Sequence, residues 1–267
     1  MSNLLAVDIG NTHTVAGVFT HDRLIAQWRI KSDGERPAAE LAVIYHNLFN
    51  LSAIDAKLFS GAIVASVVPS LDTVYKECMQ SLFGGQHQFS SLNVTADSVA
   101  GLIEVDLENP AEVGADRLVN GISAYTRCAK NVIIIDFGTA ITFDCIAVGC
   151  RYLGGLIIPG LSLALDSLTQ RAAKLPKVDF STPPTEFIGR STVSAMKSGV
   201  LHGYGTMIAG LIEQLKAEMH NRDNLTPVVY ATGGMASILK PYVAAIDEVL
   251  PDLTLEGLQI IYQRLTN

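Results

Sequence analysis

An internal repeat divides this sequence into two halves of similar design. Residues 8–14 read Asp-Ile-Gly-Asn-Thr-His-Thr, and residues 136–142 read Asp-Phe-Gly-Thr-Ala-Ile-Thr. Both fit the pattern Asp-x-Gly-x-x-x-Thr, and the second copy starts 128 positions after the first (136 − 8) in a chain of 267 residues. Self-similarity at about half the chain length predicts two structural units built on one plan.

The segments around the two motifs also correspond. A short apolar run enters each motif, which is typical of a buried strand. A second apolar run leaves each motif, and a third begins after a polar turn. The predicted strands are 4–7, 15–19 and one from Leu24 in the first half, and 132–135, 143–148 and one from Tyr152 in the second. Each half is therefore expected to open with three strands joined by two turns.

Helical patterns fill most of the remainder. We predict helices at 38–51, 71–83 and 192–219, a helix start at Asn109-Pro110 with Glu112 in its first turn, strands at 61–68 and 227–232, and a short helix after Gly233-Gly234. The glycines of the 192–219 helix let another helix approach closely, which predicts a helix–helix contact in a homodimer. The expected fold class is α/β, with two similar domains at 1–119 and 120–267, each a mixed sheet flanked by helices.

Composition excludes several functional classes. The net charge of -7 disfavours non-specific binding to nucleic acid or to an anionic membrane, so we expect neither partner. No apolar run is long enough to span a bilayer and no targeting signal is visible, which predicts a cytoplasmic protein. The four cysteines show no CxxC pair and are expected to be reduced thiols. A zinc site at Cys145 and Cys150 is the weaker alternative.

The repeated motif has the residues of a phosphate-binding hairpin. Gly10 permits a sharp turn and a close approach of the backbone, and backbone N–H groups with the hydroxyls of Thr12 and Thr14 can then face phosphate oxygens. Asp8 ends its strand beside that turn, where a carboxylate can hold Mg²⁺. One copy alone also fits an ordinary hairpin, but two copies at corresponding places favour a nucleotide site. Neither a Walker A motif nor a GxGxxG turn after a strand occurs.

These motifs carry a resemblance to the superfamily of actin, Hsp70 and sugar kinases, and along nearly the whole chain to type III pantothenate kinases. The matching segments are 8–12, 109–117, 136–140, 154–160, Ala173 to Pro176, 188–192, 232–234 and 253–258. The resemblance implies two similar domains with an ATP cleft between them. It also implies ATP-dependent phosphorylation of pantothenate to 4′-phosphopantothenate, the first step of coenzyme A biosynthesis, by a cytoplasmic homodimer.

The resemblance also implies a role for each matching residue. Asp116 would be the general base, and ATP would be the co-substrate with Mg²⁺ and a monovalent cation, K⁺ or NH₄⁺. The pantothenate site would contain Gly114, Ala115, Asp116, Arg117 and, from the partner subunit, Thr192. The ATP site would contain Asp8, Ile9, Gly10, Asn11, Thr12, His13, Thr14, Val15, Gly138, Thr139, Gly233 and Gly234. Asp136 would hold the monovalent cation, and Asp8 the Mg²⁺.

Several residues permit a second interpretation. Asp116 and Arg117 also fit a surface ion pair, which contributes little to stability. Gly233-Gly234 can pass beneath an adenine or ribose, or it can simply begin a helix. Asp144 can face the nucleotide or bond to its own turn. Leu107 stands where many relatives carry a tyrosine that touches pantothenate. This departure bears on the shape of that pocket and on the affinity for pantothenate, but not on Asp116 or the hairpins.

Two other functions compete with the pantothenate kinase. The first is a regulator that binds ATP without turnover, and the presence of Asp8, Asp116 and Asp136 argues against it. The second is a kinase of another small hydroxy compound on the same fold. The hairpins do not exclude this second function, because they are expected to contact only ATP and not the acceptor. The fold does not determine the substrate either.

Overall fold

The computed structural model describes residues 2–86, 89–172 and 174–266. Ala173, which opens one of the family segments named above, lies outside the described residues. The chain forms two compact units, Met1–Thr126 with Asp252–Asn267 as unit 1 and Arg127–Pro251 as unit 2. The predicted domain boundary between residues 119 and 120 falls within a helix, and the C-terminal residues belong to unit 1 because they form a helix that packs on its sheet.

Unit 1 contains a mixed sheet in the order β3-β2-β1-β4-β5. Its strands are β1 (Asn3–Ile9), β2 (His13–Thr20), β3 (Arg23–Lys31), β4 (Phe59–Ser66) and β5 (Ser90–Asn93). The first three run antiparallel, with Ile9 opposite Thr14 at the first turn. β4 pairs parallel with β1, and β5 pairs parallel with β4. The ends of β1 and β4 therefore lie at the same edge of the sheet.

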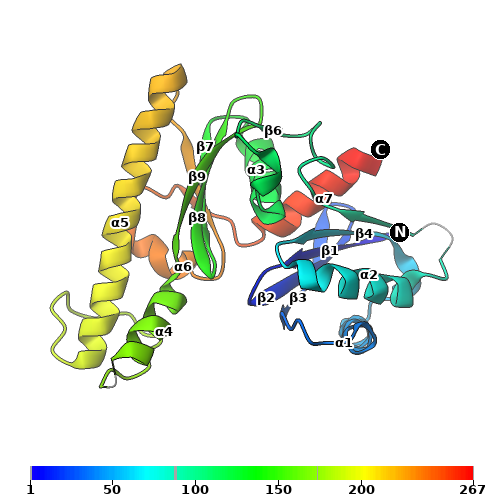
Figure 1. Ribbon diagram of the computed structural model, residues 1–267, viewed down its shortest axis with the longest axis horizontal. Helices are drawn as coiled ribbons and strands as arrows, with labels where there is room; N and C mark the ends of the chain where they lie inside the picture. The colour runs from blue at the N-terminus through cyan, green and yellow to red at the C-terminus, as the bar shows by residue number, and fades with distance from the viewer. Residues whose placement is uncertain (1, 87–88, 173, 267) are drawn as a thin grey trace. The chain divides into compact units, whose positions relative to one another are not determined.

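Helices cover both faces of this sheet (Figure 1). The helices α1 (Ala38–Leu51) and α2 (Pro69–Phe83) lie on one face, where Phe49, Phe59 and Phe83 form an aromatic cluster. The C-terminal helix α7 (Leu253–Thr266) lies on the other face, against β1, β2 and β4. The remaining elements of unit 1 are η1 (Ala56–Leu58), β6 (Glu104–Val105), η2 (Pro110–Glu112) and α3 (Ala115–Cys128, which ends in unit 2).

Unit 2 repeats the strand plan of unit 1. Its strands are β7 (Val132–Phe137), β8 (Ala140–Ala147), β9 (Arg151–Pro159), β10 (Val228–Thr232) and β11 (Glu248–Val249). They lie in the order β9-β8-β7-β10-β11, antiparallel over the first three and parallel thereafter. The strand order and directions are those of unit 1, so the predicted repeat and the predicted α/β fold class are confirmed.

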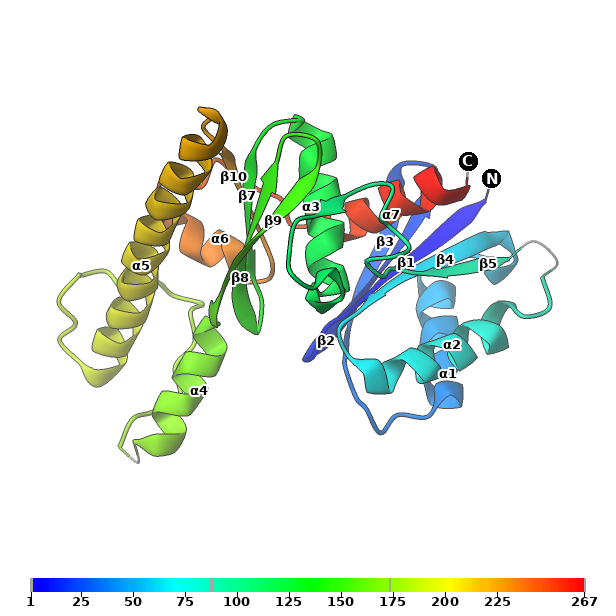
Figure 2. The same ribbon diagram turned by 45° about the horizontal axis from the view of Figure 1, so that its top comes forward.

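The helices of unit 2 gather on one face of its sheet (Figure 2). The helix α5 (Thr192–Asp223) and the short α6 (Ala236–Leu239) pack on the face that carries Ile133, Ile135 and Phe143. The helix α4 (Leu161–Arg171) follows β9 and contributes Leu161 to the same core, and η3 (Lys240–Tyr242) follows α6. A capping box of Ser191 and Ser194 begins α5.

Most predicted elements agree with the structure, and the helix start at Asn109 is wrong. Pro110–Glu112 forms only a 3₁₀ turn, because Val113 returns to an extended conformation with φ -73° and ψ 125°. The side chain of Asn109 donates to Glu112 Oε1 at 2.9 Å instead of capping a helix, and α3 begins at Ala115. The second helix begins at Pro69 rather than residue 71, and α5 extends beyond residue 219 to Asp223. The helices α4 and α7 were not predicted.

The expectations about membrane spans, cysteines and zinc can be compared with the structure. Within the described part of the chain, no helix is both long and apolar enough to cross a membrane. The four cysteines form no disulfide with one another. Among the described residues no three side chains of His, Cys, Asp or Glu come together as metal ligands, so the structure does not support the zinc alternative.

Candidate active site

The first hairpin presents its tip to solvent. Gly10 N donates to His13 O at 3.1 Å and closes the turn between β1 and β2. Asn11, Thr12 and His13 are exposed at the tip. Ile9 is one of the predicted ATP-site residues, but its side chain is fully buried in the core. It can therefore offer a ligand only its backbone groups.

Thr14 supports the hairpin from inside. Its side chain is fully buried, and Thr14 Oγ1 lies 3.1 Å from Ser32 Oγ. The hydroxyl of Thr14 therefore contacts Ser32 inside the protein, whereas Thr12 is exposed at the surface. The sequence pattern could not separate these two roles, since both threonines belong to the same short motif.

The second hairpin is built in the same way. Gly138 N donates to Ala140 O at 3.1 Å and closes the turn between β7 and β8. Gly138 and Thr139 are exposed, as are the residues at the tip of the first hairpin. Gly160 N, just beyond β9, donates to Thr139 O at 3.0 Å and holds the tip from the side. The sequence alone predicted no function for Gly160.

The Gly-Gly turn after β10 lies beside Asp136. Asp136 is half-buried at the end of β7, and it pairs in register with Thr232 on β10. Gly233 has φ +87°, and a β-carbon at this position would meet the Asp136 carboxylate and lie 2.6 Å from Phe137 N. The structure therefore brings Asp136, the second hairpin and the Gly-Gly turn together within unit 2.

A hollow of about 320 Å³ adjoins the Gly-Gly turn. Met235 and Ile238, which follow the two glycines, form one wall of it. Its other lining residues come from α4 and from the segment before α5: Ser162, Leu165, Asp166, Val178, Asp179, Phe180 and Ser181. A lining that combines apolar side chains with a few polar groups is typical of a small-molecule site.

Asp116 lies at the same edge of the sheet as the first hairpin. Val67, directly after β4, donates its backbone N–H to Ile9 O at 3.1 Å. A β-carbon at Gly114 would lie 3.3 Å from Val67 Cγ1 and 2.5 Å from Asp116 Oδ1, so Gly114 lies against both residues. The chain from Ile9 through Val67 to Gly114 thus connects the hairpin with Asp116 inside unit 1.

Burial raises the pKa of Asp116. The backbone N–H of Arg117 donates to Asp116 Oδ1 at 2.8 Å and, with the positive charge of Arg117, lowers the pKa without cancelling the effect of burial. An exposed surface ion pair would show no such desolvation, so the surface-pair interpretation of Asp116 and Arg117 is not supported. A half-buried carboxylate with a raised pKa, close to the exposed first hairpin, is typical of a catalytic acid or base.

Thr192 and Asp144 differ in burial. Thr192 is exposed in the first turn of α5 and lies in unit 2. Asp144 is fully buried on β8, where Tyr152 Oη donates to Asp144 Oδ1 at 2.7 Å. The carboxylate of Asp144 therefore bonds across to β9, and its observed role is structural.

Several solved structures share the fold of this chain. A ROK family glucokinase from Streptomyces griseus matches with a TM-score of 0.52 and 11% identity, covering 98% of this chain and 100% of that one. A Campylobacter jejuni protein named as a Baf family transcriptional activator matches with a TM-score of 0.58 and 17% identity, covering 97% and 98%. At these identities the likeness establishes the fold alone. The fold is that of the actin, Hsp70 and sugar-kinase superfamily.

Sequence comparison identifies the family within this class. The profile of the type III pantothenate kinase family matches residues 4–214. Type III pantothenate kinases from Desulfotalea psychrophila and Moorella thermoacetica are each 42% identical to the chain, over 98% of its length and 98% and 100% of theirs. One from Myxococcus xanthus is 40% identical over 98% of both chains. The chain belongs to the type III pantothenate kinase family.

Proposed function

We propose that this protein transfers the γ-phosphoryl group of ATP to the terminal hydroxyl of pantothenate, which yields 4′-phosphopantothenate for coenzyme A biosynthesis. Family membership supports the reaction. The structural observation that carries the site assignment is the position of Asp116, a desolvated carboxylate at the same sheet edge as the first phosphate hairpin. Ligands of open α/β sheets bind at such carboxyl ends of parallel strands.

In the proposed reaction each group has one task. The backbone N–H groups of the first hairpin, residues 8–15, hold phosphate oxygens. The Asp116 carboxylate accepts the proton of the pantothenate hydroxyl, whose oxygen forms a bond to the γ-phosphorus. The bond from that phosphorus to the β–γ bridging oxygen breaks, and ADP leaves. Catalysis of this kind rests mainly on placement and charge neutralisation, and Gly114, Ala115 and Arg117 are proposed to position the acceptor.

Two aspartates suit the proposed cations. A magnesium ion held with nucleotide phosphates needs only one or two protein carboxylates, and Asp8 at the end of β1 fits that requirement. Asp136, beside Gly233 and the second hairpin, is proposed to hold K⁺ or NH₄⁺. Both ions would supply positive charge that neutralises the phosphates.

The adenosine end of ATP is assigned to unit 2. Gly138, Thr139, Gly233 and Gly234 are proposed to contact the nucleotide, and the adjoining hollow has apolar walls suited to a planar base. The four cysteines form no disulfide with one another, which supports the proposed cytoplasmic location, because disulfides are rare in reducing compartments.

Activity should require pantothenate, Mg²⁺ and a monovalent cation together. We expect ADP release from ATP and pantothenate to rise about tenfold when K⁺ or NH₄⁺ replaces Na⁺, because a site that fits these larger ions binds the smaller Na⁺ less well; tenfold corresponds to about 1.4 kcal/mol. Asp136→Asn should abolish that stimulation, whereas Asp97→Asn, a substitution in a turn of unit 1, should retain it. A folded protein that binds ATP but releases no ADP with pantothenate would contradict the proposal.

The protein is also proposed to be a homodimer through α5. Gly199, Gly203 and Gly210 are exposed along this helix, and a β-carbon at each would meet no described heavy atom within 4 Å. Such a surface allows a second helix to approach closely, and the partner's first turn of α5 would then bring Thr192 to pantothenate.

A bulky side chain on this surface should separate the subunits. Gly203→Leu improves helix propensity by roughly 1 kcal/mol, so the helix itself remains. We expect sedimentation equilibrium to show a shift from dimer to monomer for Gly203→Leu and none for Gly101→Leu, an exposed glycine outside α5. A variant that stays fully dimeric would exclude this surface as the interface.

A further inference from the structure

Ser32, the residue after β3, holds the first hairpin at three points. Ser32 Oγ donates to Gly10 O at 2.6 Å, where the turn begins. The backbone N–H of Ser32 donates to Thr12 O at 3.0 Å, at the tip. Ser32 Oγ also lies 3.1 Å from Thr14 Oγ1, where the second strand leaves. One residue therefore binds the start, the tip and the end of the turn.

The second half of the chain offers an internal comparison. Gly160 stands 128 positions after Ser32 (160 − 32) and follows β9 as Ser32 follows β3. Gly160 N donates to Thr139 O at 3.0 Å, the same backbone contact with the tip of a hairpin. A β-carbon at Gly160 would lie 2.5 Å from Gly138 O, so no side chain fits there. In the second hairpin, backbone atoms leave no room for a side chain at Gly160. In the first hairpin, the hydroxyl of Ser32 occupies the corresponding place.

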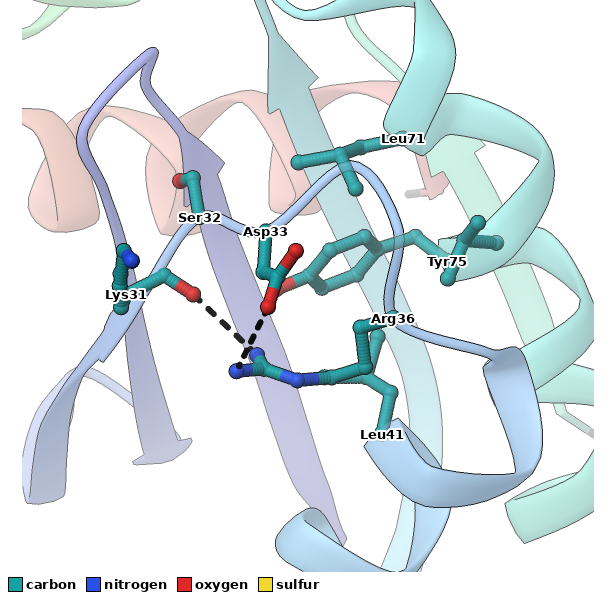
Figure 3. A pocket seen from close by; sticks show the side chains of 8 residues that line it. Lys31, Ser32, Asp33, Arg36, Leu41, Leu71 and Tyr75 are labelled. Atoms are coloured by element: carbon teal, nitrogen blue, oxygen red, sulfur yellow. Dashed lines mark hydrogen bonds and ion pairs between the residues drawn. The ribbon is translucent and has the colours of Figure 1, made fainter.

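The segment that carries Ser32 is itself held in place (Figure 3). Arg36 Nη1 donates to Lys31 O at 3.2 Å, and Arg36 Nη2 lies 3.9 Å from Asp33 Oδ2, so the guanidinium bridges the residues on both sides of Ser32. These residues line a small hollow, and Tyr75 of α2 lines it as well (Figure 3). Burial raises the pKa of Tyr75, and a hydrogen bond with Thr14 opposes that effect, which places Tyr75 beside the Thr14 hydroxyl. Contacts within the protein therefore orient the serine hydroxyl.

We propose that Ser32 is a positioning residue for phosphoryl transfer, which keeps the first hairpin in the shape that binds ATP phosphates. This inference rests on the assignment of the ATP phosphates to that hairpin. Without the hydroxyl, Gly10 O and Thr14 Oγ1 each lose a partner, and the turn must be ordered when the nucleotide binds. Ordering at that moment reduces affinity for ATP. It leaves the affinity for pantothenate unchanged.

Substitutions at Ser32 and Ser60 test the proposal. We expect Ser32→Ala to raise both the Kd and the KM for Mg-ATP about tenfold, the scale of one or two lost hydrogen bonds, with the KM for pantothenate unchanged. Ser32→Thr keeps the hydroxyl and should restore the KM for ATP to within about twofold. Ser60→Ala is the matched control, because Ser60 Oγ donates to Asn3 O at 3.5 Å, at the opposite end of β1. It should change neither KM.

Three results would overturn the inference or remove its basis. If Ser32→Ala lowers the melting temperature but leaves the KM for ATP within about twofold, the hydroxyl is only structural. Gly10→Ala, whose β-carbon would lie 2.9 Å from His13 O, disturbs the hairpin directly. Normal nucleotide affinity in Gly10→Ala would show that the ATP phosphates bind elsewhere and would remove the basis of both proposals. Weakened affinity in Gly10→Ala but not in Ser32→Ala would remove the role of Ser32 alone.

Discussion

Replacing Asp116 by asparagine is expected to lower kcat by a factor of about 10³, the usual contribution of a general base, and to raise thermal stability at the same time. The two effects have one cause. The carboxylate is desolvated, which raises its pKa and makes its charged form costly in the folded state. Asparagine keeps an oxygen for the Arg117 N–H and carries no charge.

The pH dependence follows from the direction of the pKa shift. An unfolded aspartate titrates near pH 3.9, and the folded pKa of Asp116 lies above that value. Between these two pKa values the folded state binds more protons than the unfolded state, so the contribution of Asp116 to stability falls as pH rises. Activity should show the opposite trend, because the base must be ionised. It should decline as pH falls through the raised pKa.

Melting curves and pH–rate profiles of Asp116→Asn would check both expectations. The matched control is Asp72→Asn, which changes an exposed acid in the first turn of α2. That control should lose a few tenths of a kcal/mol from the helix-dipole interaction and keep its activity. Retention of activity in Asp116→Asn would remove Asp116 as the base, and a lower melting temperature would show that burial of its charge is not the dominant effect.

Replacing Gly233 by alanine should destabilise the protein by about 3 kcal/mol, from a positive φ and from overpacking together. Gly233 has φ +87°, and its β-carbon would meet the Asp136 carboxylate and the backbone of Phe137. Either the turn or β7 must move, and because this turn is proposed to contact the nucleotide, we also expect ATP affinity to fall by about tenfold.

Gly149→Ala separates the two causes. Gly149 has φ +86°, almost the same backbone conformation, and its β-carbon would meet no described heavy atom within 4 Å. It should cost only the backbone strain of about 1 kcal/mol and leave ATP binding intact. Urea denaturation and calorimetric titration with ATP would measure the two quantities. Equal losses of stability in the two variants would show that contact with Asp136 is not responsible.

Much of the fold could be predicted because its signals are local. The strands of both hairpins are short apolar runs, and the turns between them contain Gly10 and Gly138 within the repeated motif. The topology then repeats because each half carries the same order of strands. The helix start at Asn109 was mispredicted for the same reason, since a local pattern cannot show that Val113 adopts an extended conformation.

The chemistry of the candidate site depends on contacts between distant residues. The motif alone placed Thr12 and Thr14 together, and only the packing of Ser32 and Tyr75 directs Thr14 inward. The raised pKa of Asp116 likewise comes from burial, to which residues far apart in the sequence contribute. By itself the sequence determined the family, the repeat and the residues available for catalysis, because these follow from local order. The tertiary structure alone decided which hydroxyls and carboxylates leave water, because desolvation depends on every element packed around a group.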